Sequence, residues 1–216
     1  MTDMLIHPEV NVVPRNSYVA DAPIDFETWI RLSEDLNTEL VSGVMVDRMS
    51  AQLPHEWIFV WLLTLLRNYV GKRGAGVVLG SRTAVRISDF NGRLPDILFV
   101  RAGNAEIIRK EAIYGAPDLV IEIVSPNDRP SDLIPLETDY RTLGVREIVF
   151  VDPQRKRVRV VRQSNEGEYA DEFISSGRLA LNTVPGFWVE LDWLFGEQRP
   201  SELDVALELL NNPATN

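Results

Sequence analysis

The sequence contains no cysteine, and this absence excludes several kinds of site at once. Disulfides, zinc–thiolate centres, iron–sulfur clusters and cysteine nucleophiles all need a thiol. Only two histidines are present, His7 and His55, so a zinc site with three histidines is impossible. Any metal in this protein must therefore rely on oxygen ligands, which suits Mg²⁺, Mn²⁺ or Ca²⁺.

Lysine is scarce as well, because only Lys72, Lys110 and Lys156 occur among the 22 basic residues. The net charge of −10 opposes indiscriminate binding to nucleic acid or to an anionic membrane, although it allows a local basic groove. The N-terminus lacks the basic and apolar regions of a signal peptide, and the densest apolar stretch, residues 57–66, is about half the length of a membrane span. We therefore expect a cytoplasmic protein with no membrane partner.

The length of 216 residues suits one hydrophobic core with additions at its ends. Residues 1–22 mix proline, asparagine and valine without a period, which predicts an extended N-terminal arm. We expect the main domain over residues 23–196, and a C-terminal helix and tail over residues 197–216. The sequence shows no repeat and no low-complexity segment, so the prediction is one mixed α/β domain with hairpins at its edge.

Hydrophobic periodicity predicts both helices and strands. Asp25 is expected to cap a helix that ends near Glu34, and a long buried helix is expected over residues 54–73, before Gly74. The other predicted elements are a hairpin over 38–49, strands over 77–87, 94–100, 119–124, 145–151, 157–162 and 168–174, and helices over 131–143 and 201–210.

Two acidic residues lie where a buried strand should be apolar. In residues 118–124 the period of two places Glu122 on the same face as Val120 and Val124, so its carboxylate points toward a packed surface. Asp96 begins a second apolar strand and is in the same position. Because an unpaired buried carboxylate costs several kcal/mol, roughly the penalty for an isolated buried charge, a shared divalent cation would stabilise both.

Other interpretations of these acids remain open at this stage. Asp96 follows a proline and can cap a turn, and Glu122 can pair with one of the many arginines. Two carboxylates can also act as the acid and base of a glycosidase. The basic run over residues 155–162 can contact nucleic acid or form the solvated face of a hairpin.

Short motifs in a fixed order connect the chain with a known family. They are Thr38-Glu39-Leu-Val-Ser-Gly43, His55 at the start of the long helix, Pro95-Asp96, Pro117-Asp-Leu-Val-Ile-Glu122-Ile-Val-Ser125-Pro126, Asp132 with Tyr140, Gly144-Val145 and Val151-Asp152-Pro153. In order and spacing they resemble the Uma-two family, a group assigned as nucleases with the restriction-endonuclease-like PD-(D/E)XK fold. The resemblance covers residues 25–163.

This resemblance implies a central mixed β-sheet flanked by helices, and a Mg²⁺- or Mn²⁺-dependent site that hydrolyses phosphodiester bonds. By the resemblance, Asp96 and Glu122 bind the metal together with the main-chain carbonyl of Ile123, and Glu39 is an additional catalytic acid. The implied partner is nucleic acid, DNA in particular. The family fold also implies a homodimer.

One residue departs from the family pattern. The lysine that the family carries on the helix after Ser125-Pro126 falls at Leu136, and none of the three lysines lies in this segment. Auxiliary roles are predicted for His55, Arg82, Arg129 and Tyr140. The prediction is thus an endonuclease with impaired catalysis, and the alternative is a catalytically inactive homologue that acts as a dimeric binding or regulatory protein.

Overall fold

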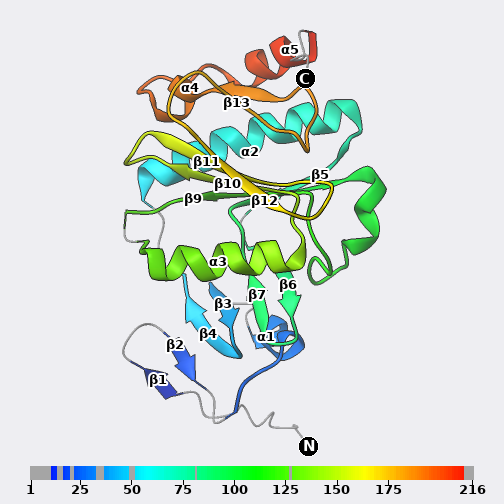
Figure 1. Cartoon of the computed structure of the whole chain (residues 1–216), viewed down its shortest axis with the longest axis vertical. Coiled ribbons are helices and arrows are strands. Elements are labelled where there is room, and N and C mark those ends of the chain that lie inside the picture. The colour runs from blue at the N-terminus through cyan, green and yellow to red at the C-terminus, as the bar shows by residue number, and fades with distance from the viewer. Residues whose placement is uncertain are drawn as a thin grey trace, which may run out of the picture.

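A six-stranded mixed sheet forms the centre of the protein (Figure 1). Its strands lie in the order β12-β11-β10-β9-β8-β5, and the β9–β10 pair is parallel while the other pairs are antiparallel. The structure is a computed structural model, and it describes residues 11–13, 17–19, 22–32, 37–48, 52–80, 82–126 and 128–211. The predicted α/β class with a central mixed sheet is confirmed.

The elements follow the chain in this order. The first half contains β1 (Asn11–Val13), β2 (Ser17–Val19), α1 (Phe26–Leu32), β3 (Thr38–Val41), β4 (Val44–Asp47), α2 (Leu53–Arg73), β5 (Gly76–Gly80), β6 (Val85–Ser88), β7 (Asn91–Arg93), β8 (Ile97–Arg101) and the short 3-10 helix η1 (Ala102–Ile107). The second half contains β9 (Leu119–Ile123), α3 (Pro130–Leu143), β10 (Glu147–Asp152), β11 (Arg157–Gln163), β12 (Tyr169–Ile174), β13 (Arg178–Ala180), β14 (Trp188–Glu190), α4 (Leu191–Phe195) and α5 (Glu202–Asn211).

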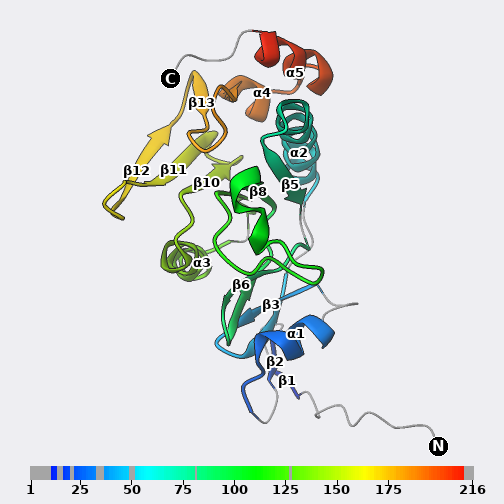
Figure 2. The same ribbon diagram turned by 90° about the vertical axis from the view of Figure 1, so that its right-hand side faces the viewer.

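Helices cover both faces of the central sheet, and each face has its own core (Figures 1 and 2). Leu119, Ile121 and Ile123 of β9 pack in the core with α2, α4 and α5. Val120 packs on the opposite face with Tyr140 of α3. The period of two predicted from the sequence is therefore confirmed, and it directs Glu122 toward the α3 face.

A second six-stranded sheet lies below the central one in Figure 1 and has the order β1-β2-β4-β3-β7-β6. The β3–β4 hairpin turns at Ser42 and Gly43, as predicted, and α1 packs on this sheet through Phe26 and Trp29. The cap predicted for α1 is present, because the Thr28 N–H donates to Asp25 Oδ1 at 2.8 Å. Glu34 lies outside the described residues.

Two sequence predictions need correction or refinement, and some elements of the fold have no counterpart in the sequence analysis. The single strand expected over 77–87 is wrong, because β5 belongs to the central sheet and β6 to the second one. The β13–β14 pair and α4 were not predicted. Within the expected arm, the described part forms the antiparallel β1–β2 pair, and β2 also pairs with β4.

Among the described residues no helix is long and apolar enough to cross a membrane.

Candidate functional site

A pocket of about 740 Å³ opens where β3, the starts of α2 and α3, and the end of β9 come together. It brings together residues that lie far apart in the sequence, because the two sheets meet here. The charged or titratable residues that line it are Glu39, Asp47, Arg48, His55, Glu56, Arg82, Arg93, Asp96, Glu122, Asp128 and Asp132. Acidic side chains therefore outnumber basic ones in the pocket.

Asp96 lines this pocket and is almost fully buried. Its Oδ2 accepts a hydrogen bond from the Ile123 N–H at 2.8 Å and lies 3.1 Å from His55 Nε2, while its Oδ1 accepts from Arg48 Nη2 at 3.0 Å. Burial alone would raise the pKa of Asp96, but the hydrogen bond with His55 and the charge of Arg48 outweigh it, so the pKa is lowered. Asp96 is therefore an anion with three fixed partners.

Glu122 projects from β9 toward α3 and is buried. Ile97 of β8 pairs with Ile121 of β9, so Asp96 and Glu122 lie at the same level of neighbouring strands. The Tyr140 hydroxyl donates to Glu122 Oε1 at 2.5 Å. Burial, reinforced by the charge of Asp96, raises the pKa of Glu122 well above its usual range.

Glu39 reaches the pocket from β3 and is held by a second arginine. Arg93 Nη1 donates to Glu39 Oε2 at 2.9 Å, and the Leu94 N–H donates to Glu39 Oε1 at 3.1 Å. Arg93 Nε also donates to Asp139 of α3 at 2.7 Å. This arginine ties the second sheet to α3 beside the two central acids.

Arg48 is the most important residue of the pocket that the sequence did not single out. It follows β4, donates from Nη1 to the Leu94 carbonyl at 2.6 Å, and pairs through Nη2 with Asp96. Burial opposes its charge, but the charges of Glu122, Asp96 and Glu39 raise its pKa. Nothing in the local sequence distinguishes Arg48 from the other arginines; its role depends on the fold that places it beside residues 94 and 96.

The structure brings most of the predicted site residues together. Glu39, Asp96, Glu122, Ile123, His55 and Arg82 all line the pocket. Tyr140 lies behind it as the buried partner of Glu122, whereas Arg129 is at the N-cap of α3 and is not among the lining residues. Burial opposes the charging of His55, but its hydrogen bond with Asp96 outweighs this effect and raises the pKa of His55.

The sequence pattern of one family, Uma2, described as "Putative restriction endonuclease", matches residues 23–193. The chain belongs to the Uma2 family. A solved structure of "a putative nuclease belonging to DUF820" from Anabaena variabilis ATCC 29413 is similar, with a TM-score of 0.63 and 18% identity over 87% of this chain and 99% of that chain. At this identity the likeness concerns the fold. The comparison with curated proteins gives no match.

Family membership confirms the resemblance and the restriction-endonuclease-like fold. All the pocket residues described above lie inside the region that matches Uma2. Leu136, where the resemblance places a lysine, is half-buried and lines the pocket from α3. The helix continues through Pro135, and Leu136 also packs against the core on the α3 face.

The pocket offers carboxylates and main-chain carbonyls, and these oxygen ligands are the kind that hard divalent cations bind. The arrangement of the side chains differs from a preformed metal centre. Among the described residues, no group of three or more histidine, aspartate or glutamate side chains is positioned to hold a metal ion. Asp96 is occupied by Arg48, His55 and the Ile123 N–H, so Arg48 places a positive charge in direct contact with Asp96 that also acts on Glu122.

The basic strand does not offer free arginines to nucleic acid. Each arginine of this run forms an ion pair with an acidic residue. Arg155 and Arg157 pair with Asp152. Arg159 pairs with Glu137 and Asp171, and Arg162 pairs with Glu147 and Glu172. These ion pairs fix β11 to its neighbours. The interpretation of this run as a structural hairpin is therefore the better supported one.

Proposed function

We propose that this chain is a nuclease that hydrolyses phosphodiester bonds of nucleic acid, with DNA as the substrate, in the pocket around Asp96 and Glu122. The observation that carries the proposal is the convergence of Asp96, Glu122 and Glu39 in one pocket of a chain that belongs to Uma2. The proposed metal is Mg²⁺ or Mn²⁺, held by Asp96, Glu122 and the Ile123 carbonyl. We further propose a cytoplasmic homodimer.

The neighbouring residues give each acid a defined task. A bound divalent cation would lower the pKa of a water molecule and neutralise charge that grows on the phosphate. His55 and the Ile123 N–H orient Asp96, and Tyr140 orients Glu122. Arg82 lines the pocket and adds positive charge for the phosphate.

Leu136 explains why catalysis by this chain should be slow. A lysine at this position would place a positive charge beside the phosphate, and the loss of one such electrostatic group typically costs about 10²–10³ in rate. An arginine in the pocket cannot replace all its functions, because a guanidinium does not exchange protons at neutral pH. We therefore propose an enzyme with weak intrinsic activity.

The alternative is a catalytically inactive homologue that binds or regulates as a dimer. The specific observation in its favour is the pairing of Arg48 with Asp96, which neutralises the site without a metal. A protein that had lost catalysis could retain Asp96 and Glu122 as the partners of Arg48 and Tyr140.

A cleavage assay separates the two functions. Plasmid and single-stranded DNA are incubated with the wild-type protein and with the double variant Asp96→Ala/Glu122→Ala in the presence of millimolar Mn²⁺ or of EDTA. We expect slow cleavage by the wild type that needs Mn²⁺ and is absent from the double variant. If both proteins behave alike under every condition, the site proposed here is not a nuclease site.

A further inference from the structure

Arg48 occupies a special place in the pocket, because one guanidinium lies among three acids. Its two terminal nitrogens are fixed, one by the Leu94 carbonyl at 2.6 Å and the other by Asp96 Oδ1 at 3.0 Å. The Arg48 side chain is 23% exposed, and that of Asp96 is 4% exposed. Glu122 and Glu39 act on the same guanidinium through their charges. The geometry is that of a cation bound at the centre of an acidic site.

A guanidinium and a divalent cation cannot both use these carboxylates without a penalty. An arginine in a protein keeps its proton under all ordinary conditions, so its charge can be removed only by moving the side chain. Two positive ions that share partly buried ligands repel each other strongly, because the surroundings screen less than water does. Arg48 and the metal therefore compete for Asp96.

We propose that Arg48 is a built-in counter-cation of this site, which stabilises the acids in the absence of metal and lowers the affinity for a divalent cation. The inference deepens the proposed function and rests on the same pocket. It explains how Asp96 and Glu122 remain buried side by side in a protein whose described residues form no preformed metal centre.

A purely structural ion pair would behave differently from a competitor. If Arg48 only stabilises the fold, its replacement lowers the melting temperature and leaves the affinity for Mn²⁺ unchanged or weaker. If Arg48 competes with the metal, its replacement lowers the melting temperature without metal but strengthens Mn²⁺ binding. The sign of the change in metal affinity therefore distinguishes the two roles.

The test is a calorimetric titration of Mn²⁺ into the wild type, Arg48→Met and Arg48→Lys. We expect Arg48→Met to bind Mn²⁺ at least about tenfold more tightly than the wild type, because one competing charge is removed. Arg48→Lys keeps the charge and should stay close to the wild type. The matched control is Arg162→Met, since Arg162 is 26% exposed and pairs with buried Glu147 away from this pocket.

Two further measurements keep the result unambiguous. Adding Glu122→Ala to Arg48→Met should abolish the gain, which assigns the metal to this site. Mn²⁺ should also raise the melting temperature of Arg48→Met more than that of the wild type, because a ligand that binds only the folded state stabilises it. Unchanged or weaker Mn²⁺ binding by folded Arg48→Met would overturn the proposal. Tighter binding without any DNA cleavage would keep it and reject the nuclease function.

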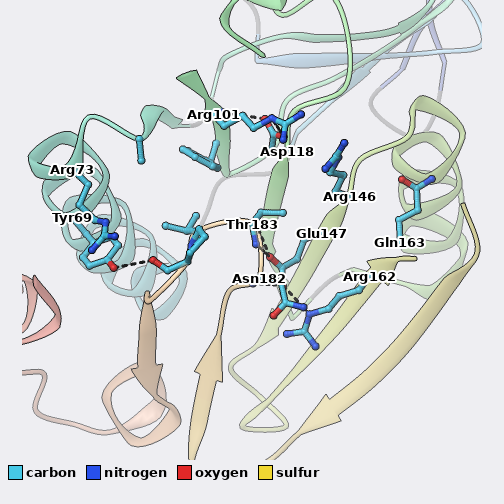
Figure 3. A pocket seen from close by; sticks show the side chains of 14 residues that line it. Tyr69, Arg73, Arg101, Asp118, Arg146, Glu147, Arg162, Gln163, Asn182 and Thr183 are labelled. Carbon is cyan, nitrogen blue, oxygen red and sulfur yellow. Dashed lines mark hydrogen bonds and ion pairs between the residues drawn. The ribbon is translucent and has the colours of Figure 1, made fainter. Parts of the chain in front are cut away.

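A second and independent inference comes from the opposite end of the central strands. There a pocket of about 560 Å³ is lined by Arg73, Arg101, Arg146 and Arg162 and by two acids, Asp118 and Glu147 (Figure 3). Both acids are satisfied within the protein. Arg101 and Asn104 donate to Asp118, whereas Arg162, Asn182 and Thr183 donate to Glu147. The pocket is thus locally positive in a chain of net charge −10.

Two of these arginines are available for a ligand. Among the described residues, neither Arg73 nor Arg146 forms an ion pair with an acid; Arg73 lies over the Tyr69 ring at 5.4 Å, and Arg146 is exposed. Guanidinium groups bind phosphate through paired hydrogen bonds. The volume is within the usual range of small-molecule sites, and Phe99, Val184 and Pro185 add apolar surface. We propose that this pocket binds a phosphate monoester of nucleotide size.

Titration with inorganic phosphate and with a nucleoside monophosphate tests this site. We expect saturable binding in which the nucleotide binds more tightly than phosphate, and a loss of at least about tenfold in the variants Arg73→Ala and Arg146→Ala. Arg109→Ala is the control, because Arg109 stacks on Tyr114 outside this pocket. Equal affinities for inorganic phosphate and for the nucleotide would mean that the site recognises phosphate alone, and this would overturn the nucleotide assignment. No saturable binding, or an equal loss in Arg109→Ala, would overturn the whole proposal.

Discussion

Replacing Tyr140 by phenylalanine removes one hydroxyl group from the buried side of the site. Tyr140 is fully buried, and its hydroxyl donates to Glu122 Oε1 at 2.5 Å. Phenylalanine keeps the ring and its packing in the core on the α3 face, so the change isolates the hydrogen bond. Glu122, which is also buried, would lose the only side-chain donor that the structure describes for it.

The size of the effect follows from the burial of the acceptor. A hydrogen bond contributes about 0.5–1.5 kcal/mol to stability, whereas removal of one partner that leaves a buried polar group unsatisfied costs about 1–3 kcal/mol. The matched control is Tyr69→Phe, because the Tyr69 hydroxyl donates to the neutral Pro185 carbonyl at 3.0 Å. We expect Tyr140→Phe to cost about 2–3 kcal/mol of unfolding free energy and Tyr69→Phe about 1 kcal/mol.

Urea unfolding followed by tryptophan fluorescence measures both losses at pH 8. A double-mutant cycle with Glu122→Gln then gives the coupling energy between Tyr140 and Glu122, which should be about 1 kcal/mol or more for residues in contact. If Tyr140→Phe costs no more than Tyr69→Phe and the cycle shows no coupling, the reasoning that Tyr140 stabilises the buried carboxyl group of Glu122 is wrong.

Two further predictions concern His55 and the state of assembly. Because the folded pKa of His55 is raised, the protonated imidazole stabilises the protein below its ordinary pKa of 6.5, and this contribution is lost as the pH rises through the raised value. The loss of unfolding free energy in His55→Asn should therefore be larger at pH 6 than at pH 9; a loss that is constant or grows with pH would contradict this. Sedimentation at micromolar concentration should show a dimer that weakens when residues 1–22 are deleted, and a strictly monomeric full-length chain would end the dimer proposal.

Much of the fold could be predicted because the local pattern and the packing agree. Alternation in β9 assigned Leu119 and Ile121 to one face and Glu122 to the other, and the two cores follow this division. The error over 77–87 has a physical cause, since β5 and β6 both contain aliphatic residues typical of strands but belong to different sheets. Local periodicity carries no information about which sheet a strand joins.

The acids that line the candidate pocket could be singled out from the sequence, but one of its basic residues could not. An acid in an apolar strand signals a special environment, and this signal identified Asp96 and Glu122 before the fold was known. Arg48 could not be found in this way, because an arginine after a short strand is ordinary. Its contacts with Leu94 and Asp96 span more than 40 residues of sequence and exist only in the folded chain.

The most direct test of the central claim is the substitution Leu136→Lys. It restores the lysine position on α3, where Leu136 already lines the pocket. The assay is Mn²⁺-dependent cleavage of plasmid and single-stranded DNA, accompanied by a thermal melt, because an ammonium that turned into the core would cost stability. We predict a gain in rate of up to about 10²–10³ that disappears when Glu122→Ala is added. A folded Leu136→Lys protein that cleaves no nucleic acid faster than the wild type would contradict the proposed nuclease site.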